Sequence, residues 1–91
     1  MRKPLSPKIQ RKLKQHLAIV GRNLHTLRKA RKESLKTVGS QIHMASTTLS
    51  RMEKGLYNFK LEKLWQLSKY YGVEVDDILF KGFPDGKKQN K

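Results

Sequence analysis

The most constraining feature of the sequence is a pair of short helical patterns between residues 35 and 55, separated by three residues. Apolar residues in both patterns recur at spacings of three and four, the period of an amphipathic helix. The second pattern ends before Gly55, and glycine just past a helix end can adopt the left-handed conformation that stops the helix. Two helices of about eight residues joined by a tight turn are therefore expected. The apolar positions are Leu35, Val38, Ile42, Leu49 and Met52.

A longer apolar stripe precedes this pair. Ser6 followed by Pro7 is a helix-start signal, because serine caps the first turn and proline is tolerated at the first helical position. The stripe permits either one helix from about 7 to 31 or two helices that break near Gly21, and the glycine favours the break. The stripe consists of Ile9, Leu13, Leu17, Val20, Leu24 and Leu27.

Two further helical patterns follow, the first ending at Gly72. The ending FPDGKKQNK is basic and rich in turn residues, so little of it is expected to pack. No segment alternates apolar and polar residues for long enough to predict a strand. The sequence thus predicts an all-α fold. The apolar positions of these patterns are Leu61, Leu64, Leu67 and Tyr71, then Val75, Ile78 and Leu79.

The charge is strongly positive and unevenly distributed. Formal net charge is +14, and residues 1–33 carry eleven Lys and Arg against one acid, a balance of +10. Residues 34–91 carry ten against six, a balance of +4. Such a field attracts polyanions, so nucleic acid is the first candidate partner, with an anionic membrane surface or an acidic protein behind it.

The length and the residue usage exclude several other classes. A chain of 91 residues supports one domain with a small core. It has no cysteine, which excludes disulfides and thiolate metal sites and suits a reducing cytoplasm. No stretch has the apolar length of a membrane span. A cytoplasmic protein is expected.

The second short helix offers a polar face. If Leu49 and Met52 face the core, its other positions carry short hydroxyl groups and two cations. Hydroxyl side chains allow close approach to base edges or phosphates, and arginine can bind guanine through two donors. The alternative is an ordinary solvent-facing surface; the net charge and the turn spacing favour a helix that reads DNA. The polar positions are Ser46, Thr47, Thr48, Ser50, Arg51 and Lys54.

From about Val20 to Leu79 the chain resembles the phage-repressor-type (Cro/XRE-like) helix-turn-helix DNA-binding family. The resemblance implies a five-helix lambda-repressor-like domain, to which this chain adds an extra basic N-terminal helix. The residues that carry it are Leu24, Arg28, Val38-Gly39, Met44, Leu49-Ser50, Glu53-Lys54-Gly55, Leu64, Leu67, Tyr71-Gly72-Val73 and Ile78-Leu79.

The resemblance also implies roles for individual residues. Arg28 and Glu53 would form a largely buried ion pair, which makes both of them structural residues. Base and phosphate contacts would come from Ser46, Thr47, Thr48, Ser50 and Arg51, and further contacts to the phosphate backbone from Lys54, Tyr57, Asn58 and Lys60.

Four departures from the family pattern are expected to have local effects. His43 stands at the left-handed turn position, where histidine is tolerated at some strain. Ala45 stands at the cap of the recognition helix, so Ser46 is an alternative cap. Leu35 replaces a frequent glutamine that would contact phosphate, and Gly39 replaces the usual alanine while still permitting a close helix crossing.

Other chemistry-bearing residues favour structural interpretations. The three histidines are scattered without metal-ligand spacing, and no phosphate loop or nucleophile–base pair occurs. We expect no metal, no cofactor, no small-molecule ligand and no enzymatic activity. The aromatic residues of the fourth pattern are expected in the core or a dimer contact, namely Trp65, Tyr70 and Tyr71.

The expected organisation is a basic helical extension over 1–18, a DNA-binding domain over 19–80 and a flexible basic tail over 81–91. The expected function is sequence-specific binding of double-stranded DNA by a small transcriptional regulator, expected to be a repressor, that acts by operator occupancy. Alternatives are an antitoxin or a restriction-system controller of the same fold, or a basic module that binds an acidic partner or a membrane surface. A homodimer through Leu79, Phe80 and Phe83 is a further expectation, and the extension could serve DNA contacts, packing or dimerisation.

Overall fold

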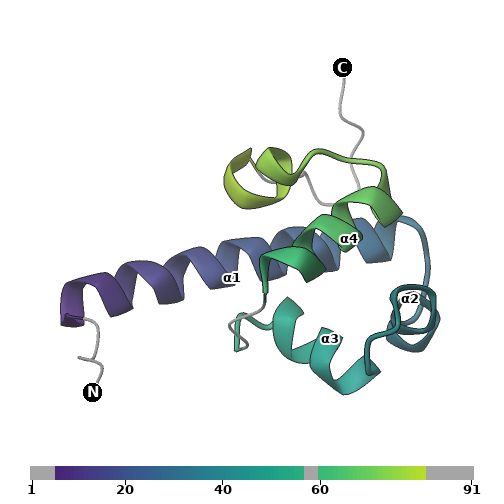
Figure 1. Cartoon of the computed structure of the whole chain (residues 1–91), viewed down its shortest axis with the longest axis horizontal. Helices are drawn as coiled ribbons and strands as arrows, with labels where there is room; N and C mark the ends of the chain where they lie inside the picture. Colours follow the sequence, from purple (N-terminus) through teal and green to yellow (C-terminus); the bar gives the residue numbers. More distant parts are fainter. Residues whose placement is uncertain (1–5, 57–59, 82–91) are drawn as a thin grey trace.

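The computed structural model describes residues 6–56 and 60–81. Four α-helices and a final π-helical turn make up these residues, and none of them forms a strand, which confirms the all-α prediction. Figure 1 shows one long helix with the shorter elements along its second half; α3 and η1 contact this helix, and α2 contacts α3 and α4. The elements are α1 (Pro7–Ala30), α2 (Leu35–Ile42), α3 (Ser46–Glu53), α4 (Leu61–Tyr71) and η1 (Asp77–Lys81).

The first helix runs without interruption through Gly21, so the break favoured by the sequence is wrong. Ser6 caps α1 as predicted, its hydroxyl accepting a hydrogen bond from the Ile9 amide at 3.2 Å. Gly21 is buried where α1 crosses the end of α3, and a Cβ there would lie 2.4 Å from the carbonyl oxygen of Met52. The glycine therefore permits a close helix crossing and does not end a helix. The basic N-terminal segment is continuous with the first helix of the domain.

The core lies between the second half of α1 and the other helices. The apolar stripe of α1 enters it only from Val20 onward, because Leu13 and Leu17 are half-buried and Ile9 is 54% exposed. Figure 1 shows the N-terminal turns of α1 extending past the rest of the domain. The buried apolar residues are Val20, Leu24, Val38, Ile42, Leu49, Met52, Leu64, Leu67, Tyr71, Val75 and Ile78.

Two of the three aromatic residues on α4 lie in or against the core, and one does not. Tyr71 is buried and Tyr70 is half-buried against it, with ring centroids 5.2 Å apart. Trp65 is 54% exposed and is not a core residue, because it lies outside the side of α4 that Leu64, Leu67 and Tyr71 bury. A dimer contact through Trp65 stays a prediction. Phe80 is 67% exposed, and its ring centroid lies 5.5 Å from that of His16 in a T-shaped arrangement. Phe83 lies outside the described residues.

The turn between α2 and α3 has the predicted left-handed residue. His43 has φ 57° and ψ 49°, and its amide donates to the carbonyl oxygen of Gly39. Ala45 is the N-cap of α3 and makes no side-chain cap bond. Ser46 is the first residue of the helix, so the alternative that it caps α3 is wrong; its side chain stays available on the helix.

Replacing His43 with glycine is expected to raise the melting temperature by a few degrees. Glycine removes a left-handed strain of about 1–2 kcal/mol, partly offset by about 0.4–1 kcal/mol from a more flexible unfolded chain. Thermal unfolding followed by circular dichroism measures the shift. His43→Ala is the matched control, because it keeps the Cβ and the strained φ and should not stabilise. A lower melting temperature for His43→Gly would contradict the strain argument.

Candidate nucleic-acid interface

Two buried residues fix the orientation of α3 about its own axis. Leu49 and Met52 are completely buried, which turns the opposite side of the helix outward. Thr47 and Arg51, one turn apart, lie on that outward side and are both exposed. The remaining predicted contacts flank this side: Lys54 is exposed, whereas Ser46, Thr48 and Ser50 are half-buried.

The other predicted phosphate contacts lie near the start of α4. Lys60 is exposed at the N-cap of α4 and makes no side-chain cap bond. Tyr57 and Asn58 lie outside the described residues. Leu35 begins α2 and is half-buried, so it supplies no polar contact at the position where the family often has glutamine.

An open groove of about 620 Å³ is lined by α1 and the C-terminal half of α3, beside their close crossing at Gly21. Arg22 and His25 line it from α1, and Ser50 and Lys54 line it from α3. Because Ser50 and Lys54 also border the outward side of α3, the groove adjoins the recognition surface. Its basic and hydroxyl side chains suit an anionic group.

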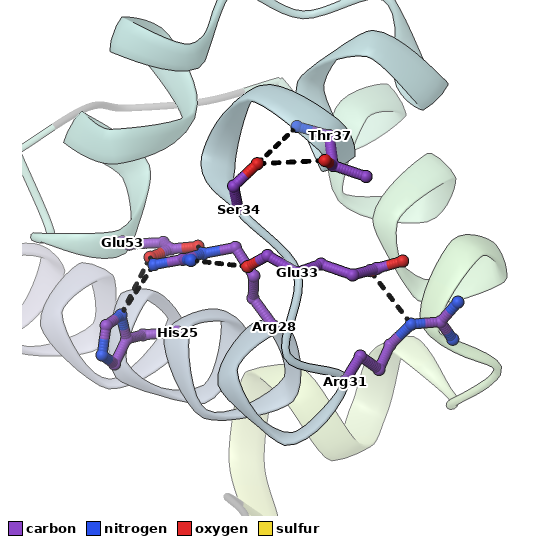
Figure 2. A network of polar contacts seen from close by, with 7 residues as sticks. All are labelled: His25, Arg28, Arg31, Glu33, Ser34, Thr37 and Glu53. Atoms are coloured by element: carbon purple, nitrogen blue, oxygen red, sulfur yellow. Dashed lines mark hydrogen bonds and ion pairs between the residues drawn. The ribbon is translucent and has the colours of Figure 1, made fainter.

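Arg28 and Glu53 are both in the lining of this groove, and Figure 2 shows their side chains meeting. The guanidinium is bidentate: Nε donates to one carboxylate oxygen at 2.8 Å and an Nη to the other at 3.0 Å. Their side chains are only 10% and 5% exposed. The hydrogen bond to Glu53 raises the pKa of Arg28 above its usual value, despite the opposing effect of burial. The pair ties α3 to α1.

Two further contacts to this pair could not be expected from the sequence. Nδ1 of His25 lies 3.0 Å from the second oxygen of Glu53, with the imidazole half-exposed in the groove. The other Nη of Arg28 donates to the backbone carbonyl of Glu33 at 2.9 Å. Arg28 therefore also holds the chain that leaves α1 (Figure 2). Helical spacing places His25 one turn from Arg28, but only the crossing of α1 over α3 directs it at Glu53.

Glu33 connects the same network to α4. Its carboxylate accepts a hydrogen bond from the Tyr70 hydroxyl at 2.8 Å and from Arg31 Nε at 3.1 Å. The Arg31 guanidinium also lies over the Tyr70 ring, 4.8 Å from its centroid. The turn that places Glu33 between Arg31 and Tyr70 contains Lys32 at φ 57°, a left-handed conformation. Because this residue is not glycine, the sequence gives no signal of that conformation. The Arg28–Glu53 ion pair, which holds α3 against α1, is thus linked through Glu33 to this turn and to α4.

Residues 24–78 match the family profile described as helix-turn-helix, of the XRE/Cro-like type, over more than half of the chain. The chain belongs to the XRE/Cro-like helix-turn-helix family. Domains of this family bind double-stranded DNA and occur in transcription regulators, so the protein is a DNA-binding domain of that regulatory class. The match begins inside α1, and the preceding turns of that helix lie outside it.

The comparisons with curated proteins and with solved structures gave no significant match to the chain. Within the described residues, none of the helices combines the length and the apolarity that a membrane crossing requires.

Proposed function

We propose that this helix-turn-helix protein binds a specific operator sequence and represses transcription by occupying it. The observation that carries the proposal is the rigid presentation of the outward side of α3. Buried apolar residues fix the rotation of this helix, and the Arg28–Glu53 pair fixes its end against α1. A recognition helix must be held in this way, because a base contact tolerates little error in position.

In the proposed complex α3 enters the major groove, which is about 12 Å wide. Arg51 is exposed and forms no ion pair with any described residue, so its guanidinium is available for a guanine edge. Thr47 and Ser50 contact neighbouring base edges or phosphates. Lys54 and Lys60 bind the phosphate backbone on either side, and Tyr57 and Asn58 are proposed to assist from the connector.

We also propose that two copies bind a palindromic operator, with half-sites about 34 Å apart. Phe80 supports this step, because two thirds of its surface is exposed at the end of the domain. Leu79, half-buried beside it, and Phe83 complete the predicted apolar contact.

Replacing Arg51 with alanine is expected to reduce operator binding by about 5–150-fold, equivalent to about 1–3 kcal/mol, and to leave binding to random duplexes much less affected. The reason is that a bidentate guanine contact contributes only at the correct base pair. Competition gel-shift titrations at one fixed salt concentration measure the ratio between the two affinities.

Lys60→Ala is the control, because a phosphate contact contributes equally to all sequences and its loss should preserve that ratio. If Arg51→Ala weakened every duplex alike, Arg51 would be a phosphate contact. The operator itself is found by footprinting genomic fragments, and the absence of any protected site at moderate salt would overturn the proposed function.

A further inference from the structure

One face of α1 carries a line of six residues, four of them Lys or Arg, that the core does not use. Its members recur at spacings of three and four, so they lie above one another on the helix surface. We call this line the α1 stripe; it consists of Arg11, Lys14, Ala18, Arg22, His25 and Lys29.

The α1 stripe is exposed and its charge is uncompensated. All six residues are exposed, and its four Lys and Arg side chains form no ion pair with any described residue. The first acid of the sequence is Glu33, beyond the end of α1, so no carboxylate on this helix neutralises them. From Arg11 to Lys29 the stripe covers 18 residue-to-residue steps, or about 27 Å at 1.5 Å per step.

The position of the α1 stripe relative to α3 is set by close contacts. Ala18 lies against Gly55, where an added Cβ would come within 2.9 Å of the Ala18 Cα. Arg22 and His25 share the groove with Ser50 and Lys54 of α3. The stripe therefore runs beside the outward side of α3, and Figure 1 shows the N-terminal turns of α1 continuing past α3.

We propose that the α1 stripe binds the phosphate backbone of the DNA flanking the segment read by α3. This inference rests on the proposed function and extends it, giving the protein a longer footprint than its helix-turn-helix unit alone requires. Phosphate charges on one strand are spaced by about 3.4 Å along the axis, so 27 Å of cationic helix can follow several consecutive base pairs. Arg22 and Lys54, on opposite sides of the groove, bind the phosphate nearest α3, and Arg11 and Lys14 bind phosphates farther out.

An anionic membrane is less well matched to this face. A membrane-surface helix inserts apolar side chains beside its cations. On the α1 stripe the apolar member is Ala18. The exposed Ile9 and Ile19 lie on other sides of the helix, and Val20 and Leu24 are buried in the core. The surface is therefore suited to a polyanion that stays outside the protein.

The test uses the full chain with Arg11→Gln/Arg22→Gln as the stripe variant. The control is Lys12→Gln/Lys69→Gln, which removes the same charge from exposed positions off the stripe, on α1 and α4. Operator affinity is measured across a range of salt concentrations, and hydroxyl-radical footprinting maps the protected sugars. The stripe variant should lower the slope of log K against log salt by about 1.8, or 0.9 for each lost phosphate contact, and should lose protection on the flank.

The possible outcomes distinguish phosphate binding by the α1 stripe from operator binding by α3. A smaller slope and a shorter footprint for the stripe variant alone support the inference. Equal slopes and unchanged footprints for both variants would overturn it while the central footprint still supported operator binding. The inference would also be wrong if the stripe variant bound DNA like the wild type but no longer bound phosphatidylserine vesicles that the wild type binds. The stripe would then be a membrane-binding surface. A wild-type protein without any footprint would refute the proposed function itself.

Discussion

Replacing Glu53 with alanine is expected to destabilise the protein by about 3–5 kcal/mol, because the Arg28 guanidinium would then be buried without its partner. Both side chains are nearly inaccessible, and two charge-assisted hydrogen bonds of 2.8 and 3.0 Å join them. Proteins of this kind have total stabilities of about 5–15 kcal/mol, so the variant is expected to be close to unfolding. Urea denaturation followed by circular dichroism measures the loss.

A double-mutant cycle with Arg28→Ala attributes this loss to the pair. The two single variants should each be strongly destabilised, and the double variant should lose clearly less than their sum. His25→Ala is the exposed control; it removes the half-exposed partner of Glu53 and should cost less than about 1 kcal/mol. A loss below about 1 kcal/mol for Glu53→Ala would mean that the pair behaves like a surface salt bridge and does not support α3.

Replacing Gly21 with alanine is expected to destabilise the protein by about 1–3 kcal/mol or more, although alanine is the better helix former. Helix propensity alone predicts a gain of about 0.5–1 kcal/mol, so the two arguments differ in sign. The clash should prevail because the added Cβ would lie 2.4 Å and 2.6 Å from two backbone carbonyl oxygens at the end of α3. Those backbone atoms belong to the recognition helix and cannot rotate away.

The same denaturation experiment on Gln15→Ala provides the comparison for Gly21→Ala. Gln15 is exposed on α1, so its substitution should change the stability by less than about 0.5 kcal/mol. Because the clash pushes α3 away from α1, operator affinity should fall in the folded Gly21→Ala protein as well. A stability equal to or above that of the wild type would show that α1 and α3 do not cross closely at this residue.

Local sequence signals were reliable where a single residue type has one strong conformational preference. Ser6 caps α1 as expected, because a serine hydroxyl satisfies an amide of the first turn. Gly55 and Gly72 adopt positive φ beyond the ends of α3 and α4. The buried positions of α3 also followed from spacing, since the core can reach one side of an amphipathic helix and no other.

Sequence signals failed where one residue type serves two purposes. Gly21 was interpreted as a helix break, yet it lies within a 24-residue helix and lets two backbones approach. A single sequence cannot separate these roles, because a glycine that breaks a helix and a glycine that permits a crossing have the same local pattern. Ser46 shows the same ambiguity: its side chain could cap a helix or project from it, and the N-cap at Ala45 settles which.

Helix periodicity, charge and the turn spacing were sufficient to indicate an all-α DNA-binding domain and the polar side of its recognition helix, because these properties depend on residues close together in the chain. The network of Glu33, Tyr70 and His25 around the buried pair depends on residues 28 to 37 positions apart, so only the packed helices bring them together. The α1 stripe depends on both local sequence and tertiary packing. Its spacing is present in the sequence, but its place beside α3 follows from the crossing of two helices at Gly21.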